Sequence, residues 1–366
     1  MGDRCFIVIF FSLPLLMVCL DKIPLGSMSE LRISIDNRSQ ICVGSVAELL
    51  EGLLPDKRVI VITDTTIDRL YADLVHRFDY ITVGYGEVNK TLQTVQGVYT
   101  RLMELGADRS TFLLGIGGGI VTDITGYVAA TYMRGVDFGF VPTTLLGQVD
   151  AAIGGKNGVN VAEYKNMVGT FAQPRFVLID VSLLHSLSPR ELRAGMAEVV
   201  KAAVVGDASL FEYMEANASP DIFVNRELMQ QIVLRSVRVK VNIVERDERE
   251  HGLRRLLNLG HTLGHAIEKC TRELTHGEAV AVGMALMAQC SVRRGIMAES
   301  EARRIEELFR RFDLVLEPPV AMAKILREVK YDKKKYGDRI RVVMPETIGR
   351  CRIEDLSFEE LENLFS

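Results

Sequence analysis

The first half of the chain alternates apolar, β-branched runs with segments of helical character, and this alternation restricts the possible folds more than any other feature. RVIVITDTTI, which begins at Arg58, ends its apolar run at a turn-forming Asp. Continuous runs of this kind indicate strands buried on both faces of a parallel sheet. Their alternation with helices, such as the one expected over 91–106, predicts a Rossmann-like open α/β sheet of the nucleotide-binding type. The further strands are expected at 80–84, 110–115, 138–141 and 175–180.

After about residue 185, long stretches follow the helical period instead. Pro189 opens one of them as a proline at the first helical position, and RELRAGMAEVVKAAVV continues it. DRIRVVMP and GRCRIEDL, near the C-terminus, have the pattern of a small hairpin. We therefore expect a nucleotide-binding α/β domain over residues 28–183 and a mainly α-helical domain over residues 184–366.

Residues 1–27 fit neither domain. Arg4 precedes a run from Cys5 to Leu20 that is apolar apart from Ser12, as in the core of a signal peptide. The run is short for a membrane span of about 20 residues, and no clear small-x-small cleavage site follows it. An export signal, a membrane anchor and a non-native extension ahead of a start at Met28 are the alternatives, and we expect this extension to lie outside the fold.

Composition argues against several classes of function. The chain has a net charge of −4 and six scattered cysteines, with no CxxC pair and no dense basic run. These features argue against a zinc ribbon, a disulfide scaffold and nucleic-acid binding. The cysteines are expected to be thiols in a reducing compartment, which predicts a cytoplasmic protein. We expect no nucleic-acid partner and no membrane partner.

The stretch GIGGGIVTDITG, residues 115–126, follows an expected strand and opens an expected helix. Glycines at such a turn let backbone N–H groups approach a phosphate at the helix N-terminus. A tight turn that only packs a helix on a sheet is an equal alternative, since the spacing is not the dinucleotide fingerprint. Asp123 inside the turn would oppose a bare triphosphate, which disfavours a P-loop.

Three of the six histidines lie within sixteen positions. His261 and His265 are spaced i, i+4, so they share one helix face, and His276 begins the next expected helix. Glu198 lies in GMAEVVKAA, where its apolar neighbours require the carboxylate to have a cation, a hydrogen bond or a metal as partner. Two histidines and one glutamate leave coordination positions open, as in catalytic zinc sites, and a structural network of buried side chains is the alternative.

Several cationic residues lie in glycine-rich or helical segments instead of in one solvated run. A lysine after two glycines, as in AAIGGKNGVN, has no evident structural reason to be there. Each of these residues alone is more often a solvated side chain. Together with Asn166 and Asn258 they could form a pocket for a phosphate and a carboxylate, and they are Arg134, Lys156, Lys165, Lys201, Lys240 and Arg254.

Five longer motifs occur in one order along the chain. They are GGGIVTDITGYVAATYMRG, PTTLLGQVDAAIGGKNGVN, GMAEVVKAA, DERE with GLRRLLNLGHTLGHAIE, and HGEAVAVGM. In combination the sequence resembles the 3-dehydroquinate synthase family over about residues 59–337. Residues 1–27 have no counterpart in the family, which favours the non-native extension.

The resemblance implies a dehydroquinate synthase-like fold and an enzyme that depends on NAD and on a divalent metal, with zinc expected and cobalt an option. Such an enzyme converts 3-deoxy-D-arabino-heptulosonate 7-phosphate into 3-dehydroquinate and phosphate, in the shikimate pathway of aromatic amino acid biosynthesis. The substrate is oxidised at C5, loses phosphate by elimination, is reduced again and closes its ring in an aldol step. NAD takes and returns the hydride, so it is not consumed.

The same resemblance assigns roles to individual residues. It implies metal ligands at Glu198, His261 and His276, and catalytic groups at His265, Lys156 and Asp150. Substrate binding is implied at Arg134, Lys156, Lys165, Asn166, Lys201, Lys240, Arg254 and Asn258. In the family the arginine matched by Arg134 reaches the phosphate in the neighbouring subunit, which implies a homodimer.

Cofactor binding is implied at the positions that match the family's NAD site. Thr66 departs from the pattern, because many members carry Asn there. The pair at 186–187 is Ser-Leu followed by Ser188, where Thr-Leu-Pro is more usual. The implied positions are Asp64, Glu87, Lys90, Gly118, Gly119, Ile120, Asp123, Thr143, Thr144, Ser186 and Leu187.

Three other functions compete with this interpretation. Other sugar-phosphate cyclases, such as 2-deoxy-scyllo-inosose and 2-epi-5-epi-valiolone synthases, share its fold and chemistry, but the charged set around Lys156 and Arg254 favours a substrate that carries both carboxylate and phosphate. Glycerol and iron-type alcohol dehydrogenases would show net reduction of NAD. A non-catalytic metal-binding scaffold would show no reaction. NADH absorbance during turnover separates the three.

Overall fold

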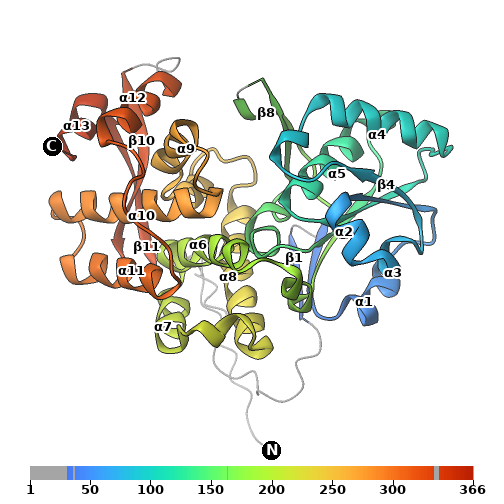
Figure 1. The fold of residues 1–366 in the computed structure, drawn as a ribbon, viewed down its shortest axis with the longest axis horizontal. Helices are drawn as coiled ribbons and strands as arrows, with labels where there is room; N and C mark the ends of the chain where they lie inside the picture. Colours follow the sequence, from blue (N-terminus) through green and yellow to red (C-terminus); the bar gives the residue numbers. More distant parts are fainter. Residues whose placement is uncertain (1–30, 36–37, 163, 334–337, 366) are drawn as a thin grey trace, which may run out of the picture.

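Seven strands form one sheet in the N-terminal half of the computed structural model, which describes residues 31–35, 38–162, 164–333 and 338–365 (Figure 1). The strand order is β1-β2-β9-β6-β5-β3-β4. All neighbours are parallel except the first pair, in which β1 lies antiparallel to β2 at the edge. The strands are β1 Leu31–Ile35, β2 Ser39–Val43, β3 Val59–Asp64, β4 Asp79–Val83, β5 Phe112–Gly117, β6 Phe138–Pro142 and β9 Phe176–Ile179.

Helices cover both faces of this sheet. Alternate residues of β3 belong to two separate apolar clusters, because successive side chains of a strand point to opposite faces: Ile60 and Ile62 join one cluster and Val61 the other. The helices α1 (Val46–Leu53), α2 (Thr65–Leu70) and α3 (Ala72–Val75) contribute to the cluster of Val61, and α4 (Leu92–Glu104) and α5 (Gly119–Thr131) contribute to the other. The predicted open α/β sheet is therefore confirmed.

The strand order reverses at β3. From β3 the chain first adds β4 on one side and then crosses back to place β5 on the other side. In open parallel sheets, ligands bind in the crevice outside the carboxyl ends of the strands at such a reversal. The ends of β3 and β5, at Asp64 and Gly117, border this crevice.

Helices dominate the second half, which lies at the left of Figure 1. As predicted, a hairpin of two antiparallel strands, β10 and β11, lies close to the C-terminus. No helix of the described residues combines the length and the apolar character that a membrane crossing requires. The elements are α6 Pro189–Gly206, α7 Ala208–Asn217, α8 Arg226–Arg246, α9 His261–Cys270, α10 His276–Arg293, α11 Glu299–Arg311, α12 Met322–Lys333, β10 Arg339–Thr347, β11 Arg350–Ser357 and α13 Phe358–Asn363.

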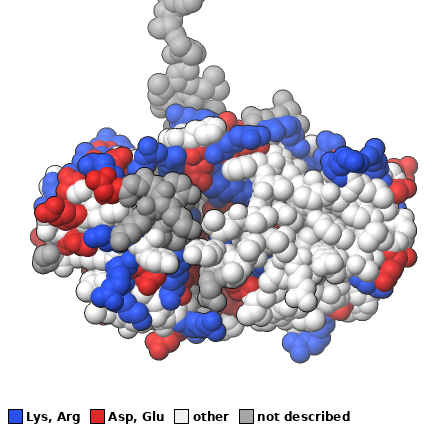
Figure 2. Space-filling view, turned by 90° about the horizontal axis from the view of Figure 1, so that it is seen from above, with Lys and Arg blue, Asp and Glu red and all other residues white. Residues whose placement is uncertain are grey.

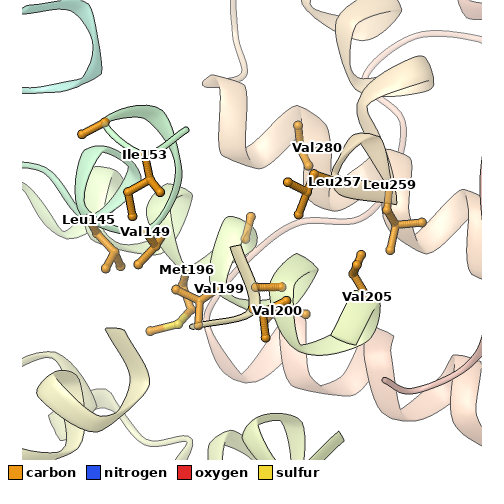
Figure 3. Close-up of a cluster of buried hydrophobic side chains, with 14 of the residues drawn as sticks. Leu145, Val149, Ile153, Met196, Val199, Val200, Val205, Leu257, Leu259 and Val280 are labelled. Atoms are coloured by element: carbon orange, nitrogen blue, oxygen red, sulfur yellow. The ribbon is translucent and has the colours of Figure 1, made fainter. Parts of the chain in front are cut away.

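Helix α6 joins the two halves. Its first turn is fixed by a capping box, and residues 195–205 are all buried. Figure 3 shows apolar side chains of both halves around this helix, with Leu145 and Val149 on one side and Leu257 and Leu259 on the other. Because this stretch is buried on all sides, its two charged residues, Glu198 and Lys201, are held in fixed positions by the side chains packed around them.

A second hairpin, β7 (Lys156–Val161) and β8 (Tyr164–Phe171), was not predicted. Its strands pair antiparallel, with Val159 opposite Val168, and β8 is visible at the top of Figure 1. Most residues of β8 are exposed, so the segment lacks the apolar alternation that identifies a strand in a sequence. This hairpin carries three of the cationic or amide residues named above, Lys156, Lys165 and Asn166.

The apolar N-terminal run and its two cysteines lie outside the described residues. Cys270, Cys290 and Cys351 are free thiols, as expected. The division of the chain at residues 183 and 184 stays a prediction, although the last sheet strand ends at Ile179 and the first long helix begins at Pro189.

Candidate active site

Three elements of the helical half bring a carboxylate and two imidazoles together. Glu198 is on α6, His261 is the first residue of α9, and His276 is the first residue of α10. Glu198 Oε1 lies 3.7 Å from His261 Nε2 and 3.5 Å from His276 Nε2. One ligand atom from each of the three residues lies within 4.8 Å of the others, so the group could hold a metal ion.

The start of α10 is fixed independently of any ligand. Thr275 accepts a hydrogen bond from the Glu278 N–H, and the Glu278 carboxylate accepts from the Thr275 N–H, which forms a capping box. The box begins the helix at His276 and so fixes the backbone from which this imidazole projects. The His265 ring, one turn along α9, is 5.3 Å from that of His261 and 5.8 Å from that of His276, measured between ring centroids.

The donor set suits a divalent cation. The Glu198 side chain is 1% exposed, and neither oxygen has a hydrogen bond of regular geometry, although Lys201 forms an ion pair with it. Burial alone would raise the pKa of Glu198, but Lys201, His261 and His276 lower it well below its usual value. A buried, ionised carboxylate between two imidazole nitrogens is a typical ligand set for zinc and similar ions.

The two imidazoles differ in charge. Burial, with the nearby Lys201 ammonium, lowers the pKa of His261 to about 3, which keeps the ring neutral. Burial also disfavours the charged form of His276, but Glu198 and Glu268 raise its pKa to about 9. A metal bound here would replace the His276 proton, since imidazole ligands bind in their neutral form.

A chain of alternating charges extends from Glu198. Lys201 lies 3.7 Å from Asp150, which also pairs with Lys240 on α8. Burial raises the pKa of Asp150, but the two ammonium groups lower it below its usual value. Burial lowers the pKa of Lys240 to about 8, which Asp150 opposes only in part. Lys201 and the less basic Lys240 therefore lie beside the group formed by Glu198, His261 and His276.

Arg254 is almost fully buried and crosses to the N-terminal half. Its Nη1 donates to the Gly154 carbonyl at 2.8 Å. Gly154 has a φ of +97°, and a Cβ there would lie 2.6 Å from Arg254 Nη2, so only glycine fits. Asp247 orders the loop before Arg254 by accepting from the backbone N–H groups of residues 251, 252 and 254.

Glu250 is a site residue that sequence reasoning missed. Its carboxylate pairs with Lys156 and accepts from the Asn258 side chain. Burial would raise the pKa of Glu250, but these contacts lower it. Glu250 has a φ of +61°, unusual for a residue with a side chain, which indicates that the surrounding loop imposes this conformation. The sequence signal was its place at the end of the DERE motif, to which no role for Glu250 was assigned.

The crevice at the strand ends collects the residues expected to bind NAD. Asp64 ends β3, where its side chain accepts from the N–H groups of Thr66 and Ile67. Gly118 follows β5, and a Cβ there would lie 2.9 Å from the Thr144 methyl group, so the turn has room only for glycine. Gly119 and Ile120 begin α5, and Thr143 and Thr144 follow β6. The structure therefore brings these residues to one edge of the sheet, with room for close backbone contact.

A hydrogen-bond network connects this crevice to the β7–β8 hairpin. Lys90 pairs with Asp123 on α5 and donates to Asn166 Oδ1 at 2.6 Å. Burial raises the pKa of Asp123 even though Lys90 opposes the shift. Asn160, which sequence reasoning missed, donates to Glu87 at 2.7 Å and accepts from the Asn166 N–H at 2.9 Å.

Two family models match the sequence of this chain. The 3-dehydroquinate synthase N-terminal model matches residues 80–194, and the 3-dehydroquinate synthase C-terminal model matches residues 195–335. Together the matches cover more than half of the 366 residues. The chain belongs to the 3-dehydroquinate synthase family.

Individual relatives agree with this family assignment. A 3-dehydroquinate synthase from Pelobacter propionicus is 40% identical over 318 residues, which is 84% of this chain and 89% of that protein. A solved 2-epi-5-epi-valiolone synthase from Streptomyces hygroscopicus, with NAD⁺ and Zn²⁺ bound, is 31% identical with a TM-score of 0.81 and coverages of 91% and 96%. A solved 2-deoxy-scyllo-inosose synthase with carbaglucose-6-phosphate, NAD⁺ and Co²⁺ is 26% identical with a TM-score of 0.83 and coverages of 92% and 98%. The fold and the enzyme class predicted from the sequence are confirmed.

Not every residue matched to the 3-dehydroquinate synthase family reaches the site. Arg134 is exposed and follows the far end of α5, about 20 Å along the helix from Gly119 at 1.5 Å per residue. Ser186 and Leu187 follow β9 at the same edge of the sheet as the other cofactor positions, and the Ser186 hydroxyl donates to the Leu183 carbonyl. The geometry therefore separates Arg134 from the other family positions in its own chain.

Proposed function

We propose that this chain is a 3-dehydroquinate synthase that converts 3-deoxy-D-arabino-heptulosonate 7-phosphate into 3-dehydroquinate and phosphate, with NAD and one divalent metal ion as cofactors. One observation carries the proposal. The ionised, buried Glu198 lies between two imidazoles and is continuous, through Lys201 and Asp150, with a pocket of cations. Such a pocket suits a substrate that carries both a carboxylate and a phosphate.

Each cofactor has a place to bind. Glu198, His261 and His276 would hold the metal, and the crevice from Asp64 to Thr144 would hold NAD. When bound, NAD supplies a hydride acceptor that returns the hydride, and the metal supplies a Lewis acid for the substrate hydroxyls. Both kinds of ligand are named in the solved structures of the two related cyclases.

The remaining residues would bind and orient the substrate and handle its protons. Lys156, Lys240 and Arg254 are cations that could hold its anionic groups, and Asn258 could donate to its hydroxyls or carboxylate. His265 lies at the exposed side of the histidine group, in reach of a substrate bound to the metal. Glu250 accepts from both Lys156 and Asn258 and would hold these two groups in place for the substrate.

Other sugar-phosphate cyclases remain the second candidate, because two of them share the fold at 31% and 26% identity. Identity to a 3-dehydroquinate synthase is higher, at 40%. The cations Lys156 and Arg254 also favour a substrate that carries a carboxylate beside its phosphate, since a forked guanidinium suits a carboxylate.

The deciding experiment supplies purified protein, NAD and a divalent metal with the heptulosonate phosphate and measures phosphate release and NADH absorbance together. Release of phosphate at constant absorbance is expected. A steady rise in absorbance would show a dehydrogenase instead. Glucose 6-phosphate in the same assay is the control, and faster phosphate release from it would favour the inosose synthase type.

We also propose a homodimer in which Arg134 serves the site of the neighbouring subunit. Figure 2 shows a broad face with few charged side chains over the N-terminal half. Exposed apolar residues gather on two segments of that half that are joined by the hydrogen bond from Asn160 N–H to the Lys90 carbonyl. These residues are Val88 (84% exposed), Leu92 (43%), Val161 (38%) and Met167 (62%).

Hybrid dimers test the dimer proposal. Arg134→Ala and His265→Ala are each expected to be nearly inactive alone. After the two are unfolded, mixed and refolded, hybrid dimers would contain one intact site, made of the His265 of one chain and the Arg134 of the other. Recovery of activity is expected, and absence of recovery in a demonstrated hybrid contradicts the role across subunits.

A cytoplasmic location fits this function. Cys290 and Cys351 are buried thiols, and burial raises the pKa of Cys290 to about 12. Thiols without disulfides are typical of reducing compartments. Fractionation of cells that express the full chain, with enzyme activity as the readout, tests the location.

A further inference from the structure

Glu268 contacts the proposed metal site from outside. It lies on α9 seven positions after His261, so His261, His265 and Glu268 share one face of the helix. Its side chain is only 9% exposed. One oxygen, Oε2, lies 3.2 Å from His276 Nδ1, while the other ring nitrogen, Nε2, lies 3.5 Å from Glu198.

The second oxygen of Glu268 reaches the other half of the molecule. Oε1 accepts from Lys165 Nζ at 2.7 Å, and Lys165 is on β8 of the hairpin that also carries Asn166. Each oxygen therefore has its own partner. His265, Glu268 and His276 could also hold an ion by their spacing, but the Lys165 ammonium already occupies one Glu268 oxygen with positive charge.

We propose that Glu268 is a positioning residue for the metal site, an inference that rests on the function proposed above. By accepting a hydrogen bond from Nδ1–H, Glu268 fixes the tautomer and the orientation of His276. The Nε2 lone pair is then directed at the space shared with Glu198 and His261. Carboxylates that hold a metal-bound histidine in this way commonly contribute 10–100-fold, in rough terms, to metal affinity. Through Lys165 the same carboxylate joins this imidazole to the β7–β8 hairpin.

Metal affinity tests this role without using activity. Metal-free protein is titrated with Zn²⁺ against a chromophoric chelator, which gives the dissociation constant and the number of ions per chain. Glu268→Ala is expected to bind Zn²⁺ about 10–100-fold more weakly than the parent. Glu268→Gln should recover part of the loss, because its amide oxygen can still accept from Nδ1–H.

Two control variants separate the contact with His276 from other effects. Lys165→Met removes the ion pair to the hairpin and leaves the histidine contact, and Glu273→Gln removes an exposed carboxylate three positions before His276. Both should bind the first Zn²⁺ with the affinity of the parent. The proposal is overturned if Glu268→Ala binds Zn²⁺ with parental affinity. It is also overturned if Lys165→Met loses as much affinity as Glu268→Ala, or if the parent binds a second ion per chain. If Glu268→Ala does not fold, as judged by circular dichroism, Glu268→Met takes its place, because it keeps most of the side-chain volume and cannot accept from Nδ1–H. Parental affinity in that variant then overturns the proposal.

The proposed function would fail differently. In that case the parent would bind no ion, or Glu198→Ala would bind Zn²⁺ as tightly as the parent. A parent that binds one ion, loses it in Glu198→Ala and keeps it at full affinity in Glu268→Ala would contradict only the role of Glu268.

Discussion

Two lysines of the proposed site should respond differently to replacement by Met. Lys201→Met should lose stability, whereas Lys156→Met should keep its stability and lose activity. Lys201 is 2% exposed and lies between Glu198, which is 1% exposed, and Asp150. Lys156 is 44% exposed and pairs with Glu250. Replacement by Met keeps most of the side-chain volume and removes only the ammonium, so burial is the main difference between the two variants.

The structure sets the expected size of each effect. Lys201→Met leaves the buried Glu198 carboxylate with the protonated His276 as its remaining cationic partner, whereas Asp150 keeps Lys240. Removing one partner of a buried ion pair destabilises a protein by about 3–5 kcal/mol when no other cation remains, so we expect a loss of at most this size, which lowers the urea midpoint by up to about 1–2 M for a typical denaturant dependence. Lys156→Met loses a half-exposed pair worth less than about 1 kcal/mol. Its kcat/KM should nevertheless fall roughly 10–150-fold, because a charge-assisted hydrogen bond to the substrate contributes about 1.5–3 kcal/mol.

Urea unfolding followed by circular dichroism measures the first effect. The protein is kept metal-free with a chelator, since a bound metal would add its own stabilisation. Phosphate release from the heptulosonate phosphate measures the second effect. Equal urea midpoints for Lys201→Met and the parent would refute the electrostatic account of the buried chain. Unchanged kcat/KM in Lys156→Met would show that this lysine is only a solvated side chain.

Three further predictions follow from the site. Chelation should abolish turnover and leave the circular dichroism spectrum largely unchanged, because the metal joins helices that are already packed; activity in protein shown to be metal-free would contradict the metal assignment. His261→Ala and Glu198→Ala should lose bound metal, whereas His265→Ala should keep the metal and lose about 10²–10⁴-fold in rate. Metal analysis and kinetics measure these effects. Equal metal loss in all three variants would mean that His265 is also a ligand. Lys240 loses its charge as the pH rises through its pKa of about 8, so kcat/KM should fall over the same range. If the same decline appears in the pH profile of Lys240→Met, another group causes the decline.

The parts of the fold that could be predicted are those with a repeating apolar pattern. The run from Val59 to Asp64 is buried from both sides, and its continuous apolar sequence shows this directly. Helix α6 begins at Pro189, where the proline and the capping residue mark the boundary. The β7–β8 hairpin has no such pattern, because β8 is mostly exposed and the turn includes Ala162 at a φ of +53°.

The same reasoning explains which site residues were found. The three histidines were visible because they lie within sixteen positions and two of them are spaced i, i+4, and Glu198 was visible because its neighbours are apolar. Glu250, Glu268 and Asn160 each stand at the end of a quoted motif, but an acid or an amide at these positions has no spacing or composition that indicates a role. Only their contacts with groups distant in the sequence distinguish them from solvated side chains.

The contrast between α6 and β8 matters for anyone who wishes to redesign this enzyme. A combinatorial library placed on α6 would mostly yield misfolded protein, since residues 195–205 have no exposed position that could absorb a change in size. On β8 the exposed Tyr164 and Phe171 can be replaced at little cost in stability, and they lie on the same strand as Lys165 and Asn166. New sugar selectivity is therefore best sought by diversifying β8 while α6 is left untouched.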